Sequence, residues 1–383
     1  MFGTRPEAIK LAPVIRELEK INDVKTVCCV TAQHRQMLDQ VLALFDIHPA
    51  HDLDIMRVDQ TLTEITAHVL TQLDKVLEKE HPDIVLVQGD TTTAMAGALA
   101  AYYHHIPVGH VEAGLRTGDK YSPFPEEINR IFIDQISDLC FAPTELAKEN
   151  LLRWGVAAGN IHVTGNTVVD ALLDASRRLA SSERNANRDK LLMGLPPWFL
   201  DCDWSDHGGR RLVLVTGHRR ESFGRDMESI SHALRLIAER NQDVEVVYPV
   251  HMNPNVREPV HRIVGGTDRI HLLEPLGYAP FVWLMSKAYI ILTDSGGVQE
   301  EAPTLGKPTL VMRKTTERPE GIEAGTAILV GVETDTIADA AQHLLDDMNA
   351  YSHMAKARNP YGDGHAAERI VGIIKRWFQG QST

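Results

Sequence analysis

The sequence predicts an α/β protein built from two Rossmann-like domains that face each other across a cleft. Its 383 residues exceed what one ordinary hydrophobic core accommodates. Short apolar runs alternate with amphipathic stretches, a rhythm typical of strand-helix-strand units with parallel strands. A polar segment over residues 181–209, which contains two adjacent prolines, separates two such series and indicates a domain boundary.

The elements follow in order from this alternation. In the first series, apolar runs predict strands and longer amphipathic runs predict helices. The strands are expected at 25–30, 84–87 and 106–108, and the helices at 36–45 and 93–103. The second series predicts strands at 212–215, 244–248, 270–273, 289–292, 309–312 and 328–330.

Composition excludes several classes of function. A formal charge of -13 disfavours non-specific binding of nucleic acid, which needs a basic surface. No apolar run approaches the roughly 20 residues of a membrane-spanning helix. The four cysteines show no CxxC spacing and are expected to be reduced packing thiols. Since the first residues lack the pattern of a secretory signal, we expect a cytoplasmic protein.

Acidic residues follow the ends of predicted strands, which is where ligands bind in open α/β sheets. Asp90 follows the strand at 84–87, and Glu112 lies in a glycine-flanked loop after the strand at 106–108. Glu126 lies at the start of a helix that prolines precede. These carboxylates are candidates for acid and base catalysis. Helix capping or interaction with the helix dipole is the alternative for Asp90 and Glu126, and a plain surface position is the alternative for Glu112.

A second group of residues suits a phosphate ligand. Ser295, Gly296 and Gly297 follow the strand at 289–292 and begin a helix, whose first N–H groups favour anions. Glu301, further along that helix, is placed to reach a ribose diol. An ordinary capped helix explains the same run.

Basic residues and a histidine also lie near helix starts and strand ends: Arg5, Lys10, His218, Arg313 and Arg318. They are candidates for contacts with a diphosphate, and structural or solvated side chains are the alternative. Phe281 and Trp283 are expected in the core, although Phe281 could flank a base. The chain has no GxGxxG loop, and Pro308 stands where a Walker motif needs Ser or Thr, which disfavours nicotinamide and ATP.

Five segments together closely resemble the bacterial non-hydrolysing UDP-N-acetylglucosamine 2-epimerases. They are GTRPEAIK at 3–10, GDTTT at 89–93, HVEAGLR at 110–116, TGHRRE at 216–221 and DSGGVQEE at 294–301. The resemblance implies a glycosyltransferase-B-like fold and a homodimer, without metal or nicotinamide cofactor. It places the first domain at 1–170, joined by a last helix at about 365–383, and the second, UDP-binding domain at 171–364.

The resemblance also implies the reaction. UDP-GlcNAc and UDP-ManNAc interconvert through anti elimination of UDP, which gives 2-acetamidoglucal, and re-addition of UDP. Removal of the C2 proton and its return on the opposite face need two positioned acid/base groups. The family's catalytic positions match Asp90, Glu112, Glu126 and His218. Its substrate-binding positions match Arg5, Lys10, Leu276, Phe281, Ser295, Gly296, Gly297, Glu301 and Arg318.

The sequence departs from the family pattern in three places. Relatives carry a short apolar strand before Gly3, and this chain has only two residues there, so a strand of the first sheet is expected to be missing. Leu276 stands where some relatives have a polar residue. Gln33, Gln36 and His251 resemble a site at which a second UDP-GlcNAc activates some members, but Asp59 replaces a basic residue of that site.

Other functions on the same fold stay open at this point. A hydrolysing relative would release free ManNAc and UDP, and a glycosyltransferase would need a pocket for an acceptor. A non-catalytic sensor would bind the nucleotide sugar and leave its C2 hydrogen in place.

Overall fold

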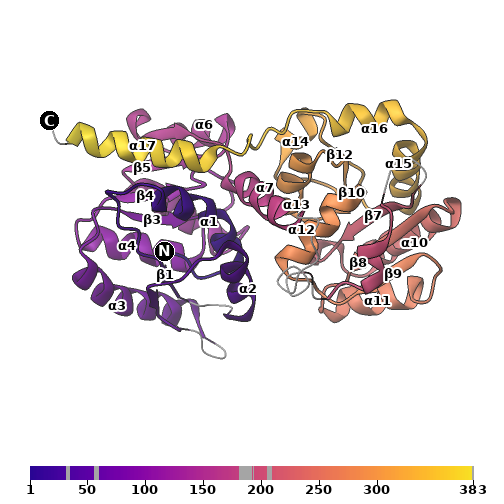
Figure 1. The fold of residues 1–383 in the computed structure, drawn as a ribbon, viewed down its shortest axis with the longest axis horizontal. Coiled ribbons are helices and arrows are strands. Elements are labelled where there is room, and N and C mark those ends of the chain that lie inside the picture. The colour runs from indigo at the N-terminus through magenta and orange to yellow at the C-terminus, as the bar shows by residue number, and fades with distance from the viewer. Residues whose placement is uncertain (32–34, 56–59, 181–191, 193, 205–208, 382–383) are drawn as a thin grey trace. The chain divides into compact units, whose positions relative to one another are not determined.

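The computed structural model describes residues 1–31, 35–55, 60–180, 192, 194–204 and 209–381. It divides into two compact units, one formed by residues 1–171 with 361–383 and the other by residues 172–360. Figure 1 shows the first unit in indigo to magenta with the yellow helix α17, and the second in rose through orange to gold.

Unit 1 contains parallel strands in two sheets. One sheet pairs β1 (Cys29–Val30) with β2 (His51–Asp52). The other has the order β3-β4-β5-β6, with β3 at Val85–Gln88, β4 at Val108–Val111, β5 at Leu139–Ala142 and β6 at Ile161–Val163. Because all four strands are parallel, their carboxyl ends lie at one edge, where Asp90 and Glu112 follow.

Helices cover these sheets, and several of them begin at capping residues. Thr4 and Glu7 form a capping box at the start of α1, and Thr61 and Glu64 form one at α3. Buried Asp170 accepts from the first N–H groups of α17, at 3.3 Å from Ala366 and 2.9 Å from Ala367. The helices are α1 (Arg5–Glu19), α2 (Arg35–Phe45), α3 (Leu62–Glu80), α4 (Thr92–Tyr103), α5 (Glu126–Ile136), α6 (Glu145–Arg153), the 3-10 turn η1 (Ala158–Asn160), α7 (Thr167–Leu179), which continues into unit 2, and α17 (Ala366–Gln381), which packs on α1.

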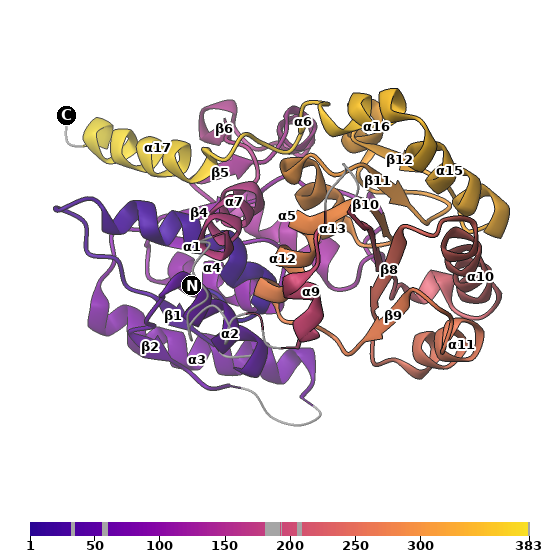
Figure 2. The same cartoon turned by 45° about the vertical axis from the view of Figure 1, so that its right-hand side comes forward.

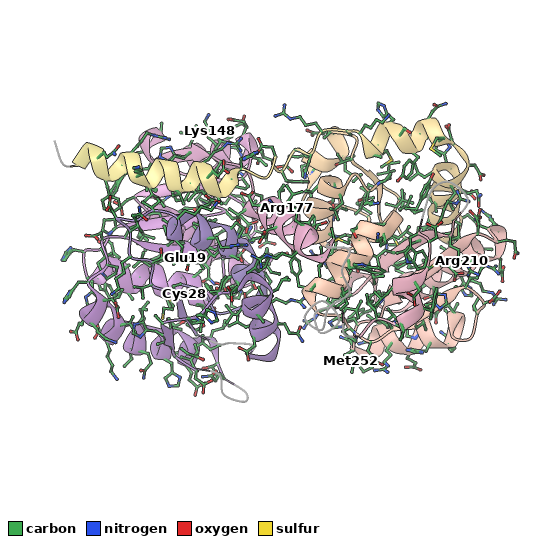
Figure 3. The ribbon with its side chains drawn as sticks, viewed as in Figure 1. Glu19, Cys28, Lys148, Arg177, Arg210 and Met252 are labelled. Atoms are coloured by element: carbon green, nitrogen blue, oxygen red, sulfur yellow. The ribbon has the colours of Figure 1, made fainter. Side chains whose placement is uncertain are left out.

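A gap separates the two sheets of unit 1. Phe2 pairs with β1, since its N–H donates to the Cys29 carbonyl at 3.2 Å, and the Met1 amino group donates to the Leu86 carbonyl at 2.9 Å. Beyond these two residues lies a cavity of about 620 Å³ between residues 24–29 and 82–86. Apolar side chains of α1, α3 and α17 line it, and Cys28 on its wall is labelled in Figure 3. The cavity has the position of a further strand between β1 and β3.

An apolar, strand-forming segment of about five residues, fused ahead of Met1, is therefore expected to raise the melting temperature by a few degrees. Each large apolar side chain buried in the cavity contributes about 1.5–3 kcal/mol, offset in part by the entropy of ordering the segment. Calorimetry of the native and extended chains measures the shift. A Gly-Ser extension of the same length is the control, and an equal shift with it would contradict this account.

Unit 2 contains one six-stranded parallel sheet with the order β12-β11-β10-β7-β8-β9. The strands are β7 (Arg211–Thr216), β8 (Val244–Pro249), β9 (Ile270–Leu273), β10 (Ala288–Thr293), β11 (Thr309–Val311) and β12 (Ala327–Leu329). β7 and β10 are central, and residues 212–215 and 290–292 are fully buried. Such continuous apolar runs are typical of strands covered on both faces.

Helices α10, α11 and α15 lie side by side on one face of this sheet (Figure 2), and α12 packs against β7 and β10. The helices of unit 2 are α9 (Pro197–Asp201), η2 (Arg220–Ser222), α10 (Arg225–Arg240), α11 (Pro254–Val264), α12 (Tyr278–Lys287), α13 (Gly296–Glu301), η3 (Ala302–Leu305), α14 (Pro319–Glu323), α15 (Thr334–Asp346) and α16 (Met348–Ala355). Among the described residues, no helix is long and apolar enough to cross a membrane.

Two of the predicted strands differ most from the structure, and β2, β5 and β6 were not predicted. The strand expected at 25–30 is reduced to Cys29–Val30, since residues 25–28 border the cavity instead of a neighbouring strand. The strand expected at 106–108 begins at Val108, one residue after Pro107, which has no N–H to donate to a ladder. Phe281 is half-buried, whereas Trp283 is buried as expected. Much of the polar segment at 181–209 lies outside the described residues.

Candidate active site

Three acidic side chains gather at the carboxyl edge of β3 and β4 in unit 1. Asp90 lies in the turn after β3, and its carboxylate pairs with Arg130 of α5 at 2.7 Å. Burial raises the pKa of Asp90 above its ordinary value; Arg130 opposes this rise, and the nearby charges of Glu112 and Glu126 add to it. A carboxyl group with a raised pKa is suited to exchange protons near neutral pH.

Glu112, directly after β4, is held in one orientation. Its φ of 69° is in the left-handed region, which a non-glycine residue adopts at a cost in energy. One carboxylate oxygen accepts from Lys10 and from Asn166, the latter at 3.0 Å, and the other accepts from Gln88. These donors come from α1, β3 and the segment after β6, so the carboxylate lies where three parts of unit 1 meet.

Glu126 is the first residue of α5 and is half-buried. Its neighbour Glu127 is buried and accepts from the backbone N–H groups of Thr117 and Gly118, at 3.1 and 3.0 Å. Glu127 therefore holds the loop before α5, whereas Glu126 contributes its charge to the surroundings of Asp90.

Two basic candidates, Arg5 and Lys10, are part of α1. Arg5 is the first residue of this helix and is half-buried, and Lys10 pairs with Glu112. Buried Glu7 accepts from the Thr91 hydroxyl at 2.6 Å and so ties α1 to the turn that carries Asp90. Glycine is required at Gly3, because a Cβ there would lie 2.1 Å from the Thr31 hydroxyl oxygen.

In unit 2, a buried aspartate organises the turn after β7. Asp294 accepts from the N–H groups of His218 and Arg219, at 2.6 and 2.8 Å, and lies 3.3 Å from Nδ1 of His218. Burial lowers the pKa of His218, and the charge of Asp294 opposes this shift. The ring also stacks on His251, with centroids 5.7 Å apart.

The Ser-Gly-Gly turn lies beside a group of arginines. A Cβ on Gly296 would lie 3.6 Å from the guanidinium carbon of Arg318, so this cation reaches the start of α13. Arg318 is anchored by buried Glu300 at 2.5 Å. Ser295 is the N-cap residue of α13, and Gly296 and Gly297 are its first two residues. The Arg318 cation and the glycine backbone at the start of α13 therefore lie next to each other in unit 2.

Glu317 lies between Arg219 and Arg313 in the same region, with a distance of 2.9 Å to Arg219. Burial opposes ionisation, but the two arginines outweigh it and lower the pKa of Glu317 to about 2. Because this pKa is depressed, the pairing stabilises the fold fully above the unfolded value near 4.5 and is lost as the pH falls through 2.

Glu317→Gln is therefore expected to lower the free energy of unfolding at neutral pH, with a difference from the native chain that shrinks at pH values between 4.5 and 2. Denaturant unfolding of both proteins over this range measures it. A difference that stays constant across the range would contradict the pairing.

The remaining sequence candidates of unit 2 lie around α12 and α13. Glu301 is buried and accepts from the Tyr278 hydroxyl at 3.1 Å. Phe281, on the same helix as Tyr278, and Leu276, in the loop before it, are half-buried. Gln33 and Asp59 lie outside the described residues, and Gln36 is part of α2.

Several residues of the candidate site were not predicted from the sequence. Gln88 and Asn166 hold Glu112, and Arg130 holds Asp90, yet none was a candidate. The signal for Gln88 and Asn166 was available, because both lie at or just after the carboxyl ends of strands. In the part of the chain that the structure describes, no group of three or more His, Cys, Asp or Glu side chains is arranged to hold a metal ion.

The chain is similar to known proteins over nearly its whole length. The family model described as UDP-N-acetylglucosamine 2-epimerase matches residues 16–375. The UDP-N-acetylglucosamine 2-epimerase of Escherichia coli K12 is 55% identical, covering 98% of this chain and 97% of that protein.

Solved structures agree. The Neisseria meningitidis UDP-GlcNAc 2-epimerase bound to UDP-GlcNAc has a TM-score of 0.87 and 47% identity, with 98% of both chains covered. The Methanocaldococcus jannaschii UDP-GlcNAc 2-epimerase, in complex with UDP-GlcNAc and UDP, has a TM-score of 0.76 and 38% identity, also with 98% of both chains covered.

Proposed function

Because the chain belongs to the UDP-N-acetylglucosamine 2-epimerase family, we propose that it reversibly converts UDP-N-acetylglucosamine (UDP-GlcNAc) to UDP-N-acetylmannosamine (UDP-ManNAc). It is an isomerase that changes the configuration at C2 of the sugar. The observation that carries this proposal is the group of Asp90, Glu112 and Glu126 at one edge of a parallel sheet, with Arg130 and Lys10 as partners.

The reaction balances as an elimination followed by an addition. A base takes the C2 proton, the electron pair of that bond forms the double bond between C1 and C2, and UDP leaves with the electrons of the C1–O bond. UDP then attacks C1 of the 2-acetamidoglucal, and an acid on the opposite face gives a proton to C2. Asp90, Glu112 and Glu126 supply these acid and base groups, and the raised pKa of Asp90 supports its part.

UDP departs readily only if donors meet its developing charge. We assign this to Arg5, His218, Ser295 and the two glycines after it, with Lys10 and Arg318 as further contacts. The Arg318 guanidinium lies close to Gly296, and this supports the assignment. Glu301 contacts the ribose, and Phe281 and Leu276 flank the uracil.

His218 has a defined protonation chemistry in this scheme. With Nδ1 directed at Asp294, a neutral ring presents a bare Nε2, which cannot donate to phosphate. A bound diphosphate favours the imidazolium, so UDP binding takes up a proton at this residue. The same proton helps to neutralise UDP as the C1–O bond breaks.

A homodimer in the cytoplasm is also part of the proposal. The family resemblance supports the dimer, and four unpaired cysteines fit a reducing compartment. Light scattering of the purified protein tests the first statement, and cell fractionation tests the second.

Activation by a second UDP-GlcNAc, which the sequence associates with Gln33, Gln36 and His251, is a secondary proposal. The stacking of His251 on His218 supports it, because a ligand that moves His251 also acts on His218. Sigmoidal dependence of the rate on UDP-GlcNAc, lost in His251→Ala, is the expected result. Hyperbolic kinetics in both proteins would contradict it.

Proton NMR of UDP-GlcNAc in deuterium oxide tests the main function. We expect deuterium at C2 together with accumulation of UDP-ManNAc. Free ManNAc would indicate a hydrolysing enzyme. Tight binding without exchange at C2 would indicate a sensor, and either result would overturn the proposal.

A further inference from the structure

A buried histidine lies on the strand that leads to Glu112, one of the three candidate carboxylates of unit 1. His110 is in the middle of β4, two residues before Glu112, and its side chain is fully buried. Its Nε2 is 2.7 Å from the carbonyl oxygen of Gly89, and its Nδ1 is 2.6 Å from a carboxylate oxygen of Asp134. The other oxygen of Asp134 pairs with Arg116 at 2.7 Å.

These partners fix the protons on the ring. A backbone carbonyl only accepts hydrogen bonds, so Nε2 carries a proton and donates it to Gly89. The carboxylate of Asp134, which pairs with Arg116, accepts in the same way from a proton on Nδ1. Both ring nitrogens of His110 therefore face acceptor groups, the Gly89 carbonyl and the Asp134 carboxylate.

The ring joins the three segments that carry the candidate carboxylates. Gly89 immediately precedes Asp90, His110 is on the strand that leads to Glu112, and Asp134 is on α5, whose first residue is Glu126. α5 also supplies Arg130 to the carboxylate of Asp90 and Asn129 to its backbone carbonyl, the latter at 2.9 Å.

This network acts on Asp90 through the backbone of Gly89, the residue before it. The glycine has a φ of 69°, and its N–H donates to the Val111 carbonyl at 3.0 Å. With its carbonyl held by His110, both backbone polar groups of Gly89 are bound to β4. A turn fixed in this way sets the direction in which the Asp90 side chain leaves the backbone.

We propose that His110 is a positioning residue for the epimerisation, and that the hydrogen bonds from its doubly protonated ring to Gly89 and Asp134 hold the Asp90 turn, β4 and α5 in register for proton transfer. The inference rests on the proposed function for its consequence in catalysis. For the state of the ring it rests only on the contacts of His110 with Gly89 and Asp134.

His110→Gln tests the kinetic consequence. Glutamine cannot donate to both partners from opposite sides, so the turn loses one anchor. We expect turnover to fall by about 10- to 100-fold, with an unchanged dissociation constant for UDP, whose proposed contacts are mostly in unit 2. His104→Gln is the matched control, because His104 makes a similar pair with Asp74 at 2.8 Å on the surface of unit 1. Equal turnover in both variants and the native chain would overturn the proposal.

NMR of the native protein with ¹⁵N-labelled histidine tests the state of the ring without any assay of activity. One ring is expected to show two N–H signals at neutral pH that exchange slowly with solvent. This signal should be absent in His110→Gln and present in His104→Gln. If His110→Gln does not fold, Asp134→Asn serves in its place and is expected to shift the same signal.

The two measurements separate the possible failures. A neutral His110 ring with one bare nitrogen overturns the proposal even if the chain is a fully active epimerase. A doubly protonated ring in a native chain that exchanges no C2 proton leaves the network standing and rejects the proposed function instead.

Discussion

Asp90→Asn, Glu112→Gln and Glu126→Gln are each expected to lower turnover of UDP-GlcNAc while leaving UDP affinity nearly unchanged. An amide cannot take up or release the proton at C2, and acid/base groups of this kind contribute roughly 10²–10⁴-fold. UDP affinity persists because the proposed diphosphate and ribose contacts are mostly in unit 2. Initial rates and calorimetric titration with UDP measure the two quantities.

Glu145→Gln is the matched control, because Glu145 is an exposed carboxylate of unit 1 that pairs only weakly with Lys148. It should behave like the native chain in both assays. Unchanged turnover in all three site variants would remove the assignment of acid and base to this group.

The pH dependence of the native chain gives the same prediction a second readout. Since burial raises the pKa of Asp90, a step that needs its ionised form fails as the pH falls, at a higher pH than an ordinary aspartate would give. The loss of rate at low pH should be absent from the residual activity of Asp90→Asn. Glu112→Gln also removes a charge that raises the pKa of Asp90, so in this variant the loss of rate should occur at a lower pH.

His218→Asn is expected to weaken UDP binding and turnover together. The loss in turnover should be of the order of 10²–10³-fold, as for removal of one donor to a developing anion. The free ring has a lowered pKa, and a bound diphosphate raises it. As the pH falls from the pKa of the UDP-bound ring to the pKa of the free ring, UDP affinity of the native chain should therefore rise. The rise should be absent in His218→Asn.

His232→Asn provides the comparison, since His232 is an exposed residue of α10. It should retain both the affinity and its pH dependence. If His218→Asn lost turnover but kept native UDP affinity at every pH, His218 would act in proton transfer and not on the diphosphate.

The sequence by itself determined the architecture and predicted which residues are candidates for chemistry. Continuous apolar runs such as residues 212–215 predicted parallel strands, and polar residues after such runs identified Asp90, Glu112 and the turn at Ser295. These signals are local, because burial and chain direction at a strand end depend on a few neighbouring residues.

Only the tertiary structure decided how the site residues are paired. Lys10, which the sequence associated with a diphosphate, contacts Glu112, 102 positions away, and Asn166 reaches the same carboxylate from 54 positions away. His110 was part of a motif, but its contacts with Gly89 and Asp134 gave it a role. Such pairings follow from the register of parallel strands and the packing of α1 and α5 on them. No local pattern encodes them, because their partners are separated by whole strands and helices.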